Sequence, residues 1–342
     1  MNRPTLDPWI EEKIYQNFNQ HDESEYDQLP RHHLERYQLD MINRTLALAS
    51  EKSSFYNSLY GAVKIYSLPE MANLPFTTPE DLKENPYRML CVHPNEIIRI
   101  VTLNTSGSTG VPKRVFFTEP DLELCTDYFH HGMRNLVNET DIVGILFPFQ
   151  TPASVGDQLI NGLGRLGAKT VPLFGLPEEE ISASIESNQI TSLAGMPGQI
   201  AGLAEKYSQH SSIKTVLLSA DFVSDNVRGM IKQAWGAEVF EHYGMTEMGL
   251  GCAVSCEYQN GYHVREADLY LEIIDPETGR TVPDGDWGEI VFTTLTRIGM
   301  PFIRYRTGDI SRWKTELCSC GSKLKLLDYI QDRQVKKGRS NL

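Results

Sequence analysis

Between about residues 97 and 237, short apolar runs alternate with helical segments, and this alternation is the strongest constraint on the fold. The strand-like runs include DIVGILFP, KTVPLF, TSLAGM and KTVLLSA. Strands that alternate with helices predict a mostly parallel sheet whose two faces are both covered. The expected fold class is therefore α/β.

The flanking regions have different patterns. Residues 1–85 are expected to be mainly helical, and TTPED has a capping pair, Thr78 and Asp81, around a proline at the first helical position. After about residue 250, short strands with turn signals such as PETG and PDGDWG predict a small β-rich lobe. We expect four parts: residues 1–85 (helical segment), 86–250 (α/β subdomain), 251–330 (β-rich lobe) and 331–342 (hinge and tail).

Charge and composition exclude several classes of protein. The 342-residue chain has a formal net charge of -13, which disfavours binding to nucleic acid or to an anionic membrane surface. No run approaches the roughly 20 apolar residues that span a bilayer, and the N-terminus does not resemble a signal peptide, so we expect a cytoplasmic protein. In a reducing compartment, clustered cysteines favour metal binding over disulfides.

The stretch TLNTSGSTGVPKRVFFT, residues 102–118, contains a glycine loop between two strand-like runs. The common phosphate loop needs a following helix and Lys-Ser/Thr directly after its glycine, and this stretch has neither. GSTG alone would be interpreted as a surface turn, but the full TSGSTGVPK after a strand favours an anion site. Lys113 supplies the positive charge, and the phosphate-binding residues are predicted to be Thr105, Ser106, Gly107, Ser108, Thr109 and Gly110.

This loop resembles the signature of the adenylate-forming enzymes, which include the acyl-CoA synthetases. The segments LPFTTPEDLKENPY, LGAKTVPLFG and IIDPETGRTVPDGDWGEIVFTTL are most similar to the phenylacetate–CoA ligase-like branch. The resemblance extends from about residue 30 to about residue 335, and its motifs occur in the family's order. It implies the fold of the family's large N-terminal domain, in which parallel sheets are covered by helices beside a β-rich lobe.

A second motif, EHYGMTEMG, includes the segment from Glu241 to Gly244. The resemblance implies that Tyr243 stacks on adenine, that Glu241 lies near the adenine amino group and that Thr246 contacts the α-phosphate. Glu247 would coordinate Mg²⁺, which prefers one or two carboxylates together with phosphate oxygens. The other nucleotide-contacting residues expected here are His242 and Gly244 of this motif and Ser219, Ala220 and Asp221 of LLSADF.

The third motif, YRTGDI, contains Asp309, which the resemblance assigns to the two ribose hydroxyls. A carboxylate suits a vicinal diol because it offers two acceptor oxygens. At the hinge, IQDRQ contains Arg333, the expected ribose-contacting arginine, although Asp332 replaces the family's usual glycine.

Four residues of the β-rich lobe could bind a metal: Cys256, His263, Cys318 and Cys320. Two cysteines in a Cys-x-Cys pair, with a distant cysteine and histidine, supply four ligands for tetrahedral zinc, and the branch often has such a cluster. Four protein ligands leave no open position, so we expect a structural Zn²⁺ site. Cys252 competes with Cys256 as a ligand, and reduced, unconnected thiols are the alternative. Cys91 and Cys125 are interpreted as buried apolar residues.

The resemblance implies a two-step reaction. A carboxylic acid, by resemblance an aromatic one, attacks the α-phosphate of Mg·ATP, and coenzyme A then displaces AMP from the acyl-adenylate. In the family, a smaller C-terminal lid domain supplies a further lysine to the site. This chain stops at the hinge, and three explanations stay open: a truncated sequence, a lid on a separate protein, or a natural lidless form. The alternatives are an ATP- or acyl-adenylate-binding subunit that needs a separate lid, and an adenylating enzyme with a non-CoA acceptor. A homodimer is plausible for the branch.

Overall fold

The computed structural model describes residues 6–18, 30–103 and 112–331. Its N-terminal part is helical, with α1 (Leu6–Phe18), α2 (Arg31–Lys52), α3 (Ser54–Tyr60), α4 (Pro79–Glu84) and the 3₁₀ helices η2 (Leu68–Asn73), η3 (Pro86–Met89) and η4 (Pro94–Glu96). The predicted capping box at α4 is confirmed, because the Thr78 hydroxyl accepts from the Asp81 amide and the Asp81 carboxylate accepts from the Thr78 amide.

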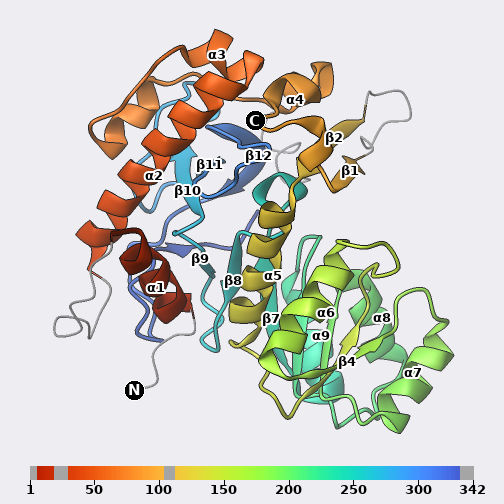
Figure 1. Cartoon of the computed structure of the whole chain (residues 1–342). Coiled ribbons are helices and arrows are strands. Elements are labelled where there is room, and N and C mark those ends of the chain that lie inside the picture. Colours follow the sequence, from red (N-terminus) through yellow and green to blue (C-terminus); the bar gives the residue numbers. More distant parts are fainter. Residues whose placement is uncertain (1–5, 19–29, 104–111, 332–342) are drawn as a thin grey trace.

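An eight-stranded sheet in the order β13-β9-β8-β7-β6-β5-β3-β4 forms the centre of the molecule (Figure 1). Its parallel strands are β3 (Ile142–Ile145), β4 (Lys169–Pro172), β5 (Ser192–Gly195), β6 (Thr215–Leu218) and β7 (Glu238–Tyr243). The connecting helices are α6 (Val155–Leu166), α7 (Glu178–Ser187), α8 (Pro197–Lys206) and α9 (Asp225–Trp235). Because the strand order reverses at β3, right-handed crossovers place α6 on one face and α7, α8 and α9 on the other.

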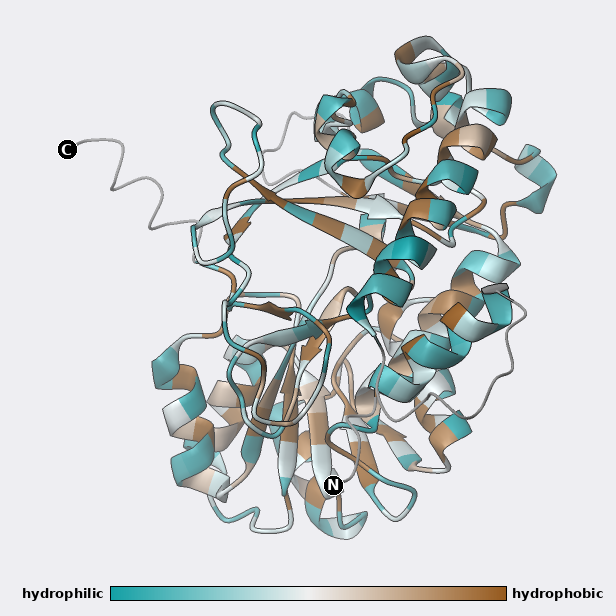
Figure 2. Ribbon diagram, turned by 90° about the vertical axis from the view of Figure 1, so that its left-hand side faces the viewer, coloured by the Kyte–Doolittle hydropathy of each residue, from teal (hydrophilic) through white to brown (hydrophobic). Residues whose placement is uncertain are grey.

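The alternation of apolar runs therefore predicted the α/β fold correctly. The parallel strands are rich in apolar residues and lie between helices whose outer faces are hydrophilic, as Figure 2 shows. Val143, Leu193, Val216 and Leu218 are completely buried. Burial on both faces is the reason these strands are continuous apolar runs in the sequence.

The strands after residue 250 belong to two sheets. β8 (Ala253–Ser255), β9 (Tyr262–Val264) and β13 (Leu326–Leu327) extend the central sheet beyond β7 by antiparallel pairing. β10 (Leu269–Ile274), β11 (Gly288–Thr294) and β12 (Tyr305–Ser311) form a separate antiparallel sheet. The central sheet therefore continues across residue 250, where the sequence pattern changes from helix-rich to β-rich.

The N-terminal helices cover the three-stranded sheet (Figure 1). Tyr37 of α2 donates to the Ala267 carbonyl at 3.0 Å, and Tyr56 of α3 donates to the Pro301 carbonyl at 2.9 Å. Both tyrosines are almost fully buried. These contacts join residues more than 200 positions apart in the chain, so the helical segment and the β-rich region share one core.

The glycine loop joins two strands, as predicted, because β1 (Arg99–Leu103) and β2 (Lys113–Phe117) pair in an antiparallel hairpin. The loop itself, residues 104–111, lies outside the described residues. β2 leads directly into α5 (Glu119–Met133), which begins with a capping box formed by Thr118 and Asp121. None of the helices in the described ranges is long and apolar enough to span a membrane.

Candidate functional site

A cavity of about 390 Å³ opens at the carboxyl ends of β6 and β7. This is the edge at which open α/β sheets bind their ligands. The residues around it come from β7, β9 and β12, from the segments that follow β6 and β7, and from the chain after β13. The lining residues are Ala220, Asp221, Phe222, Val223, Glu241, His242, Tyr243, Gly244, Met245, Tyr262, Asp309, Tyr329, Ile330 and Gln331.

Seven of the residues predicted to contact the nucleotide line this one cavity. They come from three motifs that are separated in sequence, and they are Ala220, Asp221, Glu241, His242, Tyr243, Gly244 and Asp309. The structure therefore brings together the SADF, EHYG and YRTGD motifs. Their individual contacts with a nucleotide stay predictions.

Tyr243 and Asp309 are joined across the cavity by a hydrogen bond. The Tyr243 hydroxyl donates to Oδ2 of Asp309 at 3.1 Å, and both residues are buried. Burial raises the pKa of Tyr243 well above its usual value, and the charge of Asp309 acts in the same direction. The tyrosine therefore stays a neutral donor, and it fixes the carboxylate that the sequence assigns to the ribose.

Glu241 is held by two side chains that no motif contains. Arg228 of α9 donates through Nε to Oε1 at 2.5 Å, and Tyr262 of β9 donates to Oε2 at 3.1 Å. The guanidinium of Arg228 also lies 4.7 Å from the ring centre of Tyr329. Burial raises the pKa of Glu241, and the charge of Arg228 opposes this rise. The sequence reasoning missed these three residues because their positions depend on tertiary packing and not on a local pattern.

Lys113 and Glu247, predicted to act on the phosphates and on Mg²⁺, are in direct contact although 134 residues separate them. Lys113 begins β2, and Glu247 lies in the 3₁₀ helix η5 (Thr246–Met248). The Lys113 ammonium donates to Oε1 of Glu247, and the Tyr305 hydroxyl donates to the same oxygen at 3.1 Å. Glu247 is only 1% exposed. A cation and a carboxylate are thus brought together at the start of β2, two residues after the glycine loop in sequence, as a metal–phosphate group would need.

Ser219 and Thr246 do not line the cavity. The hydroxyl of Ser219 lies 2.8 Å from Nδ1 of His242 and so contacts the site only through that ring. Burial lowers the pKa of His242 to about 3, and the charge of Arg265 adds to the effect, so the imidazole is neutral. The predicted glycine-loop residues, Thr105 to Gly110, and Arg333 lie outside the described residues.

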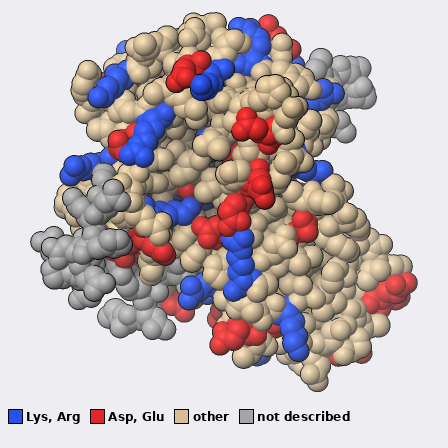
Figure 3. Space-filling model, in the orientation of Figure 1, with Lys and Arg blue, Asp and Glu red and all other residues tan. Residues whose placement is uncertain are grey.

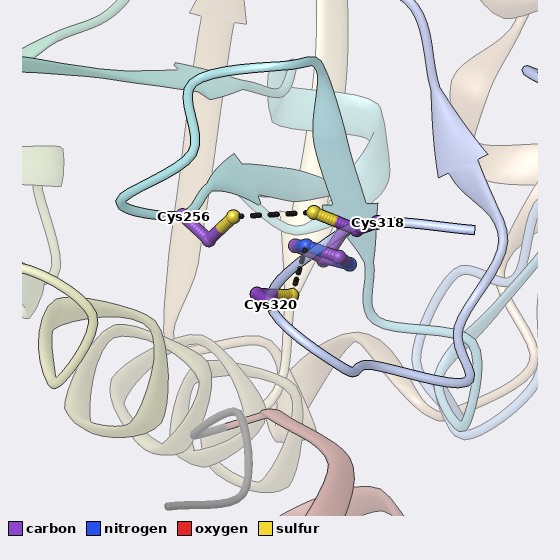
Figure 4. A group of neighbouring side chains, drawn as sticks. Cys256, Cys318 and Cys320 are labelled. Carbon is purple, nitrogen blue, oxygen red and sulfur yellow. Dashed lines mark hydrogen bonds between the residues drawn. The ribbon is translucent and has the colours of Figure 1, made fainter. Parts of the chain in front are cut away.

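The predicted metal ligands Cys256, His263, Cys318 and Cys320 are brought together, with one ligand atom from each lying within 4.8 Å of all the others. Figure 4 shows the sulfurs of Cys256 and Cys318 pointing toward each other, at 3.5 Å, and Cys320 beside the imidazole. Sγ of Cys320 lies 3.4 Å from Nε2 of His263. Zinc–thiolate bonds of about 2.3 Å in a tetrahedron separate neighbouring sulfurs by about 3.8 Å, so these residues fit a small tetrahedral ion.

The protonation of the cluster also suits a cation. Hydrogen bonds from Cys320 and His263 lower the pKa of Cys256, which favours the thiolate that metals bind. Cys252, the competing ligand, is not part of the group, so that alternative is wrong. Its thiol is completely buried, and burial raises its pKa to about 12. Cys91 and Cys125 are buried, as predicted.

Charged side chains of both signs lie on the surface of the molecule. On the face shown in Figure 3, basic and acidic side chains are interspersed and form no continuous basic patch. Several of them pair with one another, such as Arg165 with Glu123 and Lys206 with Glu179. This face lacks the basic stripe that phosphate-backbone binding requires.

Curated proteins similar to this chain include two phenylacetate–coenzyme A ligases. The protein from Pseudomonas putida is 29% identical over 294 residues, which cover 82% of this chain and 66% of that protein. The protein from Thermus thermophilus is 28% identical over 314 residues, which cover 87% and 69%. The chain thus spans about two thirds of the length of these relatives.

The fold is also similar to solved structures. A 2-hydroxyisobutyryl-CoA ligase in complex with 2-HIB-AMP and CoA superposes with a TM-score of 0.80 at 22% identity, over 88% of this chain and 70% of that one. This likeness supports the expected fold of the large domain. The model of the family described as "AMP-binding enzyme" matches residues 32–296, which include the glycine loop and the EHYGMTE motif. The chain therefore belongs to the AMP-binding enzyme family.

Proposed function

We propose that this protein activates a carboxylic acid with ATP, forming an acyl-adenylate and pyrophosphate, and that the acyl group then passes to coenzyme A. The observation that carries the proposal is the contact between Lys113 and Glu247 beside a cavity lined by Tyr243 and Asp309. The similarity to phenylacetate–CoA ligases supports the same reaction class.

In this proposal, each group acts by position and charge more than by proton transfer. Asp309, held by the Tyr243 hydroxyl, accepts from the ribose hydroxyls, and the ring of Tyr243 stacks on adenine. Glu247 would hold Mg²⁺, and the ion would neutralise charge on the phosphates. Lys113, which pairs with Glu247 in this structure, would be released to contact the phosphates, and the buried carboxylate would keep a cationic partner.

The direct test is carboxylate-dependent exchange between ATP and pyrophosphate across a panel of acids that includes arylacetic acids. We expect exchange with at least one acid, and a loss of at least about 100-fold in Glu247→Gln, comparable with losses on removing one charge-stabilising group. Glu123→Gln, on the exposed side of α5, is the matched control and should keep full exchange. ATP binding without exchange for any acid would overturn adenylation and favour a nucleotide-binding subunit.

The acceptor of the acyl group and the partner proteins are tested by additional measurements. Exchange without CoA-thioester formation would favour a carrier-protein thiol or an amine as the acceptor. Exchange that starts only when a separate lid-domain protein is added would favour the two-chain arrangement. We also propose a cytoplasmic location and a homodimer, which fractionation and light scattering would test. An aromatic acid as the preferred substrate would be compatible with the cavity wall, which includes the aromatic residues Tyr243, Tyr262 and Tyr329.

We further propose that Cys256, His263, Cys318 and Cys320 hold a structural Zn²⁺ ion. Four protein ligands complete a tetrahedron, so the ion has no position for substrate. Elemental analysis of protein prepared without chelator should give about one equivalent of zinc. Less than about half an equivalent would contradict the site.

A further inference from the structure

A second, much smaller cavity lies behind the η5 turn that carries Glu247. Its volume is about 20 Å³, and it is lined by residues of β2, of α5, of the turn, and of the start of β10 and the end of β11 with the segment that follows. Two arginines, Arg265 and Arg297, form part of its wall, and they are 3% and 5% exposed. Nothing in the proposed reaction uses either side chain directly.

Both guanidinium groups contact backbone carbonyls and aromatic rings. Arg297 donates to the carbonyls of Glu247 at 3.0 Å and Phe116 at 2.7 Å, and Arg265 donates to the carbonyl of Met248. The ring centre of Tyr128 is 4.8 Å from Arg265, and that of Phe117 is 4.3 Å from Arg297. Neither arginine forms an ion pair with a carboxylate in the described ranges. Two cations are thus buried without an ion pair, although the carboxylates of Asp121 and Asp268 lie in the same wall of the cavity.

The cavity has unmet donors. Nε and Nη1 of Arg265 and Nε of Arg297 are buried without a hydrogen-bond partner, and no other side-chain nitrogen or oxygen of the lining residues is in that state. The two carboxylates in the wall are already engaged. Asp121 accepts from the amides of its helix cap and of Ile298, and Asp268 accepts from Lys13 and Thr296.

We propose that this cavity binds a single halide ion, chloride under ordinary conditions, between Arg265 and Arg297. A space of about 20 Å³ suits one small occupant of about the size of a water molecule. The unmet groups are all donors, so an acceptor without hydrogens suits them better than water, whose two hydrogens also need acceptors.

The site is linked to the reaction centre through the backbone. The same two arginines that face the cavity donate to the carbonyls of Glu247 and Met248, and the Cys125 thiol donates to the carbonyl of Gly249 at 3.1 Å. Burial lowers the pKa of Arg297, and the positive charge of Arg265 lowers it further. The charges of Asp121 and Glu247 act in the opposite direction and raise it. A bound anion removes that repulsion and fixes the turn.

The first test is the unfolding temperature of the protein at constant ionic strength in potassium gluconate, with chloride or bromide then replacing gluconate. We expect the midpoint to rise by at least about 2 °C at saturating halide, because the ion binds the folded state. Arg265→Gln should abolish the rise. Arg165→Gln, an exposed arginine paired with Glu123, should retain it. Equal midpoints in gluconate and chloride for the unaltered protein would overturn the proposal.

The second test does not depend on a variant that folds. Crystals of the unaltered protein soaked in bromide should give an anomalous-difference peak between Nε of Arg265 and Nε of Arg297. An ordered water only, with no anomalous peak at that position, would contradict the halide. Because both measurements are independent of catalysis, failure of the proposed ligase reaction would leave them interpretable.

Discussion

The two ends of the central sheet are stabilised by different chemistry. At the parallel end, β3, β5 and β6 are buried on both faces, and Leu193 and Val216 are completely buried. At the antiparallel end, β8 and β9 have three residues each and β13 has two. One side of that end packs against the metal-ligand group of Cys256, His263, Cys318 and Cys320, while Val254, Val264 and Leu327 belong to the main apolar core.

This difference indicates that a cross-link is needed at the antiparallel end of the sheet. Hydrophobic burial stabilises a strand in proportion to the apolar area it covers, and strands of two or three residues cover little. Yet β9 provides Tyr262, and the chain after β13 provides Tyr329, to the wall of the nucleotide cavity. His263 and Leu326 are register partners in the β9–β13 pair, so a metal bound by His263 and Cys320 would hold this wall together.

Metal removal should have the largest effect, and only at the antiparallel end. Exhaustive chelation should lower the free energy of unfolding by at least about 4 kcal/mol. This is the stabilisation expected when the free ion concentration is about a thousand times the dissociation constant of the ion. Hydrogen exchange should then increase in residues 256–264 and 318–331 before it increases in β3, β5 and β6. Mass-resolved exchange of the holo and chelated proteins would measure both.

The control for metal removal is a double variant. Cys318→Ser with Cys320→Ser should reproduce the exchange pattern without chelator, whereas Cys91→Ser, outside the cluster, should not. Uniform acceleration over the whole sheet after chelation would contradict the idea that the two ends have separate sources of stability.

Leu193→Ala tests the parallel end. Leu193 lies in the middle of β5, and its Cδ2 would be 2.7 Å from a Cβ placed at Gly144, so the packing there leaves no spare room. Truncation should cost about 3 kcal/mol, within the usual range for a buried leucine, with nucleotide affinity unchanged. Urea unfolding measures this change, and Leu317→Ala, at a position that is 64% exposed, is the control. A cost below about 1 kcal/mol would contradict a tightly packed parallel end.

Arg228→Met tests the place where the two ends meet, because Arg228 of α9 pairs with Glu241 of β7. The variant leaves Glu241, 3% exposed, without its cation, and we expect a loss of about 2 kcal/mol at pH 7. Burial already raises the pKa of Glu241, and losing Arg228 should raise it further. A carboxyl whose folded-state pKa is raised loses stability as pH rises through that pKa. The variant should therefore be closer in stability to the original protein at pH 4.5 than at pH 7.

Equilibrium unfolding of both proteins across this pH range is the measurement. A stability difference that does not change with pH would indicate that Arg228 contributes packing against Tyr329 and not charge compensation.

The sequence predicted local structure and ligand-facing motifs better than it predicted the walls of the site. The caps at Thr78 and Thr118 follow from residues three positions apart, so the sequence contains the whole interaction. The roles of Lys113 and Glu247 were predictable because a site for phosphate and a metal ion needs a cation and a carboxylate close together. Arg228, Tyr262 and Tyr329 had no such signal, since their meeting depends on the packing of α9 and on the register of β9 with β13.

The choice between Cys252 and Cys256, which the sequence left open, also depends on tertiary structure. Cys252 and Cys256 are four positions apart and equally acceptable by spacing, but Cys252 precedes β8 and Cys256 follows it. The strand between them places the two thiols at opposite ends, and only Cys256 reaches His263 on the neighbouring strand. The pairing of the strands determines which cysteine lies near His263. The spacing of residues along the chain gives no information about that pairing.

The smallest expected effect concerns α5, which packs beside the antiparallel end and contacts α1. Asp127 of α5 accepts from Nε1 of Trp9 at 2.8 Å and lies 3.6 Å from the ammonium of Lys13. Burial raises the pKa of Asp127, but the hydrogen bonds from His131 and Trp9 and the charge of Lys13 outweigh it and lower the pKa to about 2. A carboxyl with a lowered pKa stabilises the fold above its unfolded-state pKa of about 4, and this stability is lost as pH falls toward 2.

Asp127→Asn should therefore cost about 1 kcal/mol at pH 7, after allowance for the partial exposure of the carboxylate. The difference between the two proteins should shrink as pH falls from 5 to 3, and urea unfolding at several pH values would measure it. Glu123→Gln, on the same helix and paired only at the surface, should show no such trend. A constant difference would mean that the hydrogen bond from Trp9 alone, without the charge of Asp127, attaches α1 to α5 at this point.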